Sequence, residues 1–152
     1  IEDDYERQKY EIRNDESLKL AKDYSEKVAC FFEILKQKDT VGIEFRMQDE
    51  TLRDCLDLIQ WYHYLFEAKT ARALTSAKDE EEYGCNPYDS LGIAKLLLVS
   101  AKRNIAAWGY LYNVFKDEEG EILDILVVLQ RFERALRQRF PQAESFIREG
   151  LD

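Results

Sequence analysis

Four long runs of apolar residues recur along this chain at alternating steps of three and four. Such spacing places the apolar residues on one side of an α-helix, and that side must be buried against other helices. The clearest run comprises Ala94, Leu98, Ala101, Ile105, Trp108, Tyr112 and Phe115. We therefore predict an all-α protein folded as an antiparallel, up-down-up-down four-helix bundle.

Composition agrees with this fold class. The 152 residues include only 2 prolines and 6 glycines, whereas a sheet protein of this length needs many more turns. With 45% hydrophobic and 35% charged residues, the chain can bury one substantial core. We predict a single domain over residues 1–152.

Charge and cysteine content narrow the function classes. A formal charge of −9 repels nucleic-acid phosphates and anionic lipids, so nucleic acid is an unlikely partner. No apolar run approaches the roughly 20 residues of a membrane span, and the first residues are acidic where a signal peptide is basic. The 3 cysteines lack metal-site spacing and indicate free thiols. A cytoplasmic protein is expected.

The repeat boundaries predict four helices and three connections. We expect helices over about 3–37, 51–77 (beginning as early as 45), 89–116 (or from Pro87) and 122–140, joined by connections over 36–42, 76–90 and 116–121. Pro141 should end the last helix, and residues 142–149 should add a short C-terminal helical extension. The polar first turns are expected to fray or to pack on a partner subunit.

The second predicted helix carries two adjacent apolar seams. The principal seam contains Leu52, Cys55, Ile59, Tyr62 and Phe66. The second seam contains Leu58, Trp61, Leu65 and Ala68. Two seams are expected to bury a wide arc of this helix against two neighbours. The nearly continuous apolar stretch 122–129 is likewise expected to be buried on most sides.

Metal-ligand patterns are sparse. His63 is the only histidine, and Gln60 occupies the position where a Glu-x-x-His motif requires a carboxylate. We therefore expect His63 to flank the core between Ile59 and Phe66 rather than to bind a metal. Cys30 and Cys55 are expected to fill core space, and Cys85 is the most reactive thiol candidate.

Two acidic pairs offer an alternative function. Asp23 and Glu26 share one helix face, as do Asp54 and Asp57 on the next helix, and such pairs can jointly hold Mg²⁺. This pattern resembles that of the all-α nucleoside triphosphate pyrophosphatases, which implies a Mg²⁺-dependent nucleotide phosphohydrolase. Solvated helix faces paired with nearby lysines and arginines are the interpretation that we favour.

A basic series near the C-terminus could bind an anion or pair internally. It comprises Arg131, Arg134, Arg137, Arg139 and Arg148. In the predicted topology these arginines lie at the same end as the acidic residues 2–6 and 79–82, so we favour pairing within the molecule or across a dimer.

Aromatic clusters identify the candidate interaction surface. Trp61 and Tyr64 in the second helix and Tyr110 in the third belong to clusters of consecutive aromatic residues, which cannot all face one core. Together with Arg131 and Arg134, they are the candidate binding residues. We expect a non-catalytic protein that self-associates or binds another protein and requires no cofactor; a small-ligand binder is a further alternative.

Overall fold

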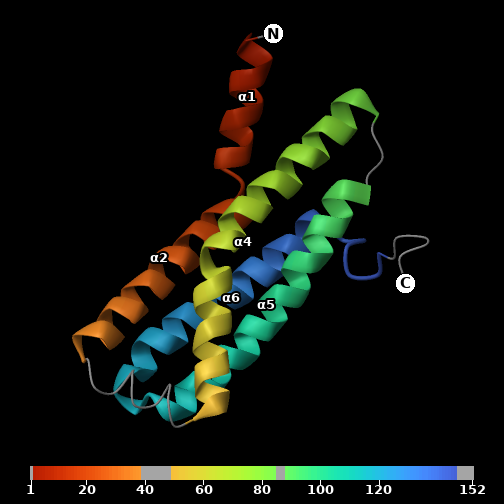
Figure 1. Cartoon of the computed structure of the whole chain (residues 1–152). Helices are drawn as coiled ribbons and strands as arrows, with labels where there is room; N and C mark the ends of the chain where they lie inside the picture. The colour runs from red at the N-terminus through yellow and green to blue at the C-terminus, as the bar shows by residue number, and fades with distance from the viewer. Residues whose placement is uncertain (1, 39–48, 85–87, 147–152) are drawn as a thin grey trace.

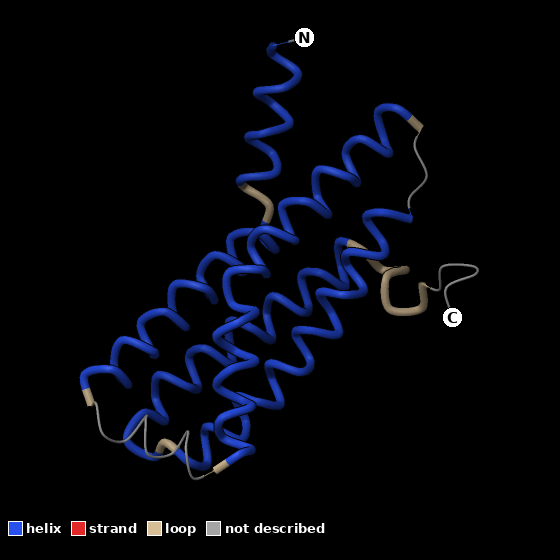
Figure 2. The backbone as a smooth tube through the Cα atoms, in the orientation of Figure 1, coloured by secondary structure: helices blue, strands red, loops and turns tan. Residues whose placement is uncertain are grey.

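The computed structural model describes residues 2–38, 49–84 and 88–146. Within these ranges the chain is all-helical, with no strand (Figure 2). Its elements are α1 (Glu2–Arg13), α2 (Glu16–Gln37), α4 (Glu50–Tyr83), α5 (Tyr88–Val114), the 3₁₀ turn η1 (Lys116–Glu118) and α6 (Glu119–Arg139). The all-α prediction is confirmed. Among the described helices, none is both long enough and apolar enough to cross a membrane.

Four of these helices surround one core. α4 packs against α2 and α5, and α6 packs against the same two helices (Figure 1). The buried residues form one cluster, whose largest side chains include Trp108, Tyr24, Phe31, Phe66 and Phe132. Burial of these apolar side chains is the main source of stability in such a fold.

The predicted first helix is divided in two, which corrects the expected single helix over 3–37. α1 ends at Arg13, and Asp15 adopts an extended conformation before α2. The Asp15 carboxylate accepts hydrogen bonds from the Ser17 backbone at 2.9 Å and from the Ser17 hydroxyl at 2.5 Å. Asparagine and aspartate favour such caps over helix interiors, so Asn14 and Asp15 separate the two helices. α1 then projects beyond the other helices (Figure 1).

α4 continues six residues beyond its expected end at Ala77, so the predicted loop over 76–90 is largely helical. Its acidic residues 79–82 do not break a helix, since charged side chains are tolerated on an exposed face. Gly84, with φ of 64°, ends α4 in the left-handed region that glycine adopts without strain. Glu80 accepts hydrogen bonds from the Ser90 amide at 3.2 Å and the Ser90 hydroxyl at 2.7 Å, so a side chain of α4 caps the first turn of α5.

The connection between α5 and α6 is as short as expected and contains η1. The C-terminal prediction is wrong for the described part, because residues 141–145 form turns rather than a helical extension. Pro141 follows the end of α6 directly and prevents its continuation. Several expectations lie outside the described residues: the connection over 39–42, an early helix start at 45–48, Cys85, Pro87 and Arg148.

Three burial predictions are wrong. In the second seam of α4, Trp61 and Ala68 are exposed and Leu58 and Leu65 are only half-buried. In the stretch 122–129, Leu123 and Val127 are exposed on the outside of α6. Cys30 is exposed rather than a core filler. In each case a residue next to an apolar seam lies beyond the arc that the neighbouring helices cover.

Candidate interaction surface

The exposed seam of α4 is the largest departure from the burial pattern. We define the outer stripe as this seam together with the one position that continues it at each end. Its members, at steps of four and three, are Asp54, Leu58, Trp61, Leu65, Ala68 and Arg72. An α-helix turns about 100° per residue, so these six positions lie within about 40° of one line along α4. Trp61 exposes 64% of its surface, and the neighbouring Tyr64 exposes 51%.

The opposite side of α4 fixes the orientation of the helix. Ile59 and Phe66 are fully buried there, and the Phe66 ring contacts Tyr24 and Phe132 edge-on at centroid distances of 5.3 and 5.4 Å. These aromatic contacts add to the free energy of burial. Because α4 cannot rotate without exposing Phe66, the outer stripe is held in solvent.

A buried polar network joins α2 and α5 in the core. The Trp108 ring nitrogen donates to the Tyr24 hydroxyl at 3.0 Å, and that hydroxyl donates to Asn104 at 3.2 Å. Asn104 donates to the Ser100 carbonyl at 2.8 Å. Burial raises the pKa of the Tyr24 phenol well above its ordinary value, so the hydroxyl remains protonated. The network pairs its buried polar groups and defines how α2 and α5 align.

Tyr110 holds the beginning of α4 rather than forming part of an open surface. Its hydroxyl donates to the Asp49 carboxylate at 2.8 Å, while the Leu52 amide donates to the same carboxylate at 3.1 Å. The Leu52 hydrogen bond, followed by the one from Tyr110, lowers the pKa of Asp49. The hydrogen bond to Asp49 raises the pKa of Tyr110. This cap anchors the first turn of α4 to α5.

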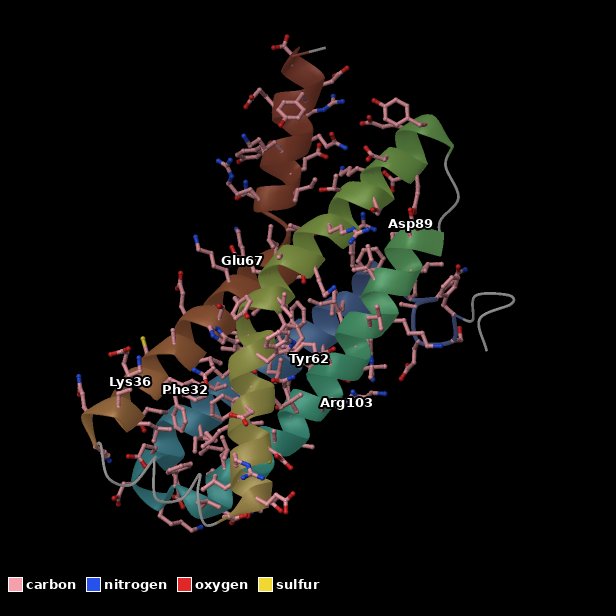
Figure 3. All side chains as sticks on the ribbon, viewed as in Figure 1. Phe32, Lys36, Tyr62, Glu67, Asp89 and Arg103 are labelled. Atoms are coloured by element: carbon pink, nitrogen blue, oxygen red, sulfur yellow. The ribbon has the colours of Figure 1, made fainter. Side chains whose placement is uncertain are left out.

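The three predicted aromatic residues therefore separate. Trp61 and Tyr64 lie on the exposed side of α4, while Tyr110 is half-buried at the contact between α4 and α5. In Figure 3, Tyr62 lies on the side of α4 that is turned toward α5, the helix that carries Arg103. The Tyr64 ring meets His63 edge-on, with centroids 5.2 Å apart.

His63 joins α4 to α2. Its Nδ1 lies 3.1 Å from the Ser25 hydroxyl, and burial lowers the pKa of the imidazole. The expectation that His63 flanks the core between Ile59 and Phe66 agrees with this half-buried position. A neutral imidazole is a hydrogen-bonding partner for Ser25 at neutral pH.

The two acidic pairs of the magnesium hypothesis do not lie together: Asp23 and Asp54 lie on different faces, and Asp57 is exposed on α4. Asp23 and Glu26 line a groove between α2 and α6, together with Glu121 and Asp124. Asp54 exposes 70% of its side chain and lies 4.0 Å from Arg53. Because Asp54 precedes the α2-facing His63 by nine positions, it points about 180° away from α2. Within 2–38, 49–84 and 88–146, no group of three or more His, Cys, Asp or Glu side chains is arranged to hold a metal ion.

The arginine series is partly paired, but with other acids than expected. Arg137 contacts Glu133 at 2.7 Å and Glu144 at 3.3 Å, and Arg139 lies 3.9 Å from Asp15. Arg131 and Arg134 are exposed on α6. The partners therefore come from α6 itself, from the turns after it and from the junction of α1 and α2.

Several residues that position this surface were not found from the sequence. Ser25, Asn104 and Asp49 make contacts with residues 38 or more positions away, which helical spacing does not reveal. The buried Glu118, which pairs with Lys38, was also missed. Only Asp49 carried a usable signal, because an aspartate just before an apolar repeat is a typical N-cap.

No protein-family model, curated protein or solved structure matches the chain.

Proposed function

We propose that this chain is a non-catalytic helical-bundle protein that acts by association, either with a second copy of itself or with another protein. The exposed aromatic surface at Trp61 and Tyr64 is the observation that carries the proposal. Tryptophan and tyrosine are enriched where protein interfaces contribute most of their binding energy. On a helix whose opposite side is fixed in the core, they form a rigid apolar surface.

The architecture that we propose for this function is an antiparallel, up-down-up-down bundle of α2, α4, α5 and α6. Its support is the pattern of contacts, in which each of these helices packs against two others. We further propose a cytoplasmic location, supported by the free thiols of Cys30 and Cys55, since reducing compartments keep thiols unpaired.

Sedimentation across a concentration series tests self-association. We expect the wild-type chain to form a species larger than its 18.0 kDa monomer, and we expect Trp61→Ala combined with Tyr64→Ala to remain monomeric. Tyr83→Ala is the matched control because Tyr83 is also an exposed aromatic residue of α4, at the end of the helix. The control should sediment as the wild type does.

A photo-crosslinking residue at position 61 tests association with other proteins. A crosslinking residue at position 83 is the control. The association proposal is wrong if the wild type is monomeric and neither position 61 nor position 83 forms a crosslink to any protein in a lysate. A crosslink that depends on position 61 supports a protein partner.

A magnesium-dependent nucleotide phosphohydrolase is the weaker proposal. Its support is the groove between α2 and α6 that Asp23 and Glu26 line together with Glu121 and Asp124. Calorimetric titration with Mg²⁺ and nucleoside triphosphates should give heat and turnover that are lost in Asp23→Asn if this proposal holds. The absence of both signals contradicts it.

A further inference from the structure

We propose that the outer stripe of α4 is a homodimer interface in which two copies of α4 pair antiparallel across a two-fold axis near position 63. This inference rests on the proposed associating function and names the partner as a second copy of the chain. It begins from the six positions Asp54, Leu58, Trp61, Leu65, Ala68 and Arg72, whose steps of four and three match the seam of a two-stranded coiled coil.

The stripe is symmetric about position 63. Asp54 lies as far before this position as Arg72 lies after it. The same holds for Leu58 with Ala68, and for Trp61 with Leu65. In an antiparallel pair with a two-fold axis at position 63, each residue therefore faces its counterpart in the other copy, as an isologous interface requires.

The facing residues are complementary in charge. Asp54 of each copy meets Arg72 of the other, which places one ion pair at each end of the contact. Both residues are exposed, and the Asp54 side chain is 70% accessible. A parallel pair would instead place Asp54 beside Asp54 and Arg72 beside Arg72. Charge therefore selects the antiparallel orientation.

The facing residues are also complementary in size. Leu58 meets the small Ala68, and the large Trp61 meets Leu65 on each side of the axis. Alternation of large and small side chains allows two helices to approach within about 8–10 Å. Trp61 contributes the largest newly buried surface, because it is 64% exposed in the single chain.

Within the described residues, Asp54, Trp61, Ala68 and Arg72 of the stripe are exposed, and Leu58 and Leu65 are only half-buried. α1 contacts α4 through Glu11, whose carboxylate pairs with Lys78. Lys78 lies six positions after Arg72 and therefore points about 120° away from it around the axis of α4. The contact spans about 27 Å of helix from position 54 to position 72, at a rise of about 1.5 Å per residue.

Charge reversal tests this interface on the full-length chain. Asp54→Arg and Arg72→Glu should each weaken the homodimer about tenfold or more, because two-fold symmetry places every new repulsion twice in the dimer. Arg103→Glu is the matched control for charge, since Arg103 is an exposed arginine of α5. This control should leave the dissociation constant unchanged.

Mixing the two variants provides the decisive arm. In the mixed pair the introduced arginine faces the introduced glutamate, and the native Arg72 faces the native Asp54. An equimolar mixture should therefore form a heterodimer as stable as the wild-type homodimer, although neither variant dimerises well alone. Sedimentation velocity with one variant fluorescently labelled measures this recovery.

The outcomes separate this inference from the proposed function. A wild type that dimerises while both reversals and their mixture retain its dissociation constant overturns the α4 pairing and leaves self-association in place. Weakened single variants without recovery on mixing overturn the antiparallel register. A wild type that is monomeric at every concentration overturns both the pairing and self-association. Circular dichroism of each variant checks that a weakened dimer is not caused by misfolding.

Discussion

One side of α4 lies in the core and the other in solvent, although both sides repeat apolar residues at helical spacing. On the inner side Ile59 and Phe66 are fully buried, and the Phe66 ring contacts Tyr24 of α2 and Phe132 of α6. On the outer side Trp61 is exposed, and Leu65 is only half-buried. An apolar repeat therefore identifies a surface that can be buried, whereas the number of neighbouring helices decides whether it is buried within one chain.

The largest expected contrast comes from truncating one large aromatic residue on each side. Phe66→Ala should lower the free energy of unfolding by about 3–5 kcal/mol, because it leaves a cavity between Tyr24 and Phe132. Trp61→Ala should change the stability of the single chain by less than about 0.5 kcal/mol, as surface substitutions usually do.

Urea denaturation at low protein concentration measures both values without a contribution from association. Similar losses for the two variants would contradict the assignment of inner and outer sides. A large loss for Trp61→Ala alone would show that Trp61 is covered within the chain.

The buried polar network offers a second test of the inner side. Tyr24→Phe removes the hydroxyl between Trp108 and Asn104, so it leaves two buried polar groups without this partner. We expect a loss of about 1–3 kcal/mol in the free energy of unfolding. Tyr5→Phe is the control, because Tyr5 is exposed on α1. Equal stability of Tyr24→Phe and the wild type would mean that the network contributes nothing.

The junction between α1 and α2 tests whether α1 affects the outer stripe. Asp15→Ala should cost about 1 kcal/mol, because Asp15 caps α2. Hydrogen exchange should increase in α1 and the first turn of α2, while association stays unchanged. A change in the dissociation constant would indicate that α1 contributes to the interface.

The smallest expected effect concerns pH. Burial lowers the pKa of His63 below its value in the unfolded chain, so the unfolded state binds the proton more readily. The stabilising contribution of neutral His63 is therefore present above about pH 6.5 and is lost as the pH decreases through the lowered pKa. His63→Gln should show a flatter dependence of unfolding free energy between pH 7 and pH 5. An unchanged slope would place the titration on another group.

Helical spacing predicted the all-α class and most of the core, including Phe66, Trp108 and Leu129. It did not predict the division at Asn14 and Asp15, because a local cap interrupted a pattern that was already weakly apolar. It also placed the end of α4 too early, since charged residues are compatible with an exposed helix.

The candidate surface was predicted only in part. Trp61 and Tyr64 were identified because consecutive aromatic residues cannot all face one core. The same reasoning also selected Tyr110, which binds Asp49 through a contact 61 positions apart in sequence. Whether the second seam of α4 is covered depends on how many helices surround it. The spacing of residues within one helix gives no information about that number.

Oxidative footprinting across a concentration series tests the central claim most directly, because it reports which side of α4 is covered on association. We predict that Trp61 and Tyr64 become protected as the concentration increases, whereas the exposed Tyr5 and Tyr83 oxidise at a constant rate. Association that leaves the oxidation of Trp61 and Tyr64 unchanged would contradict the account.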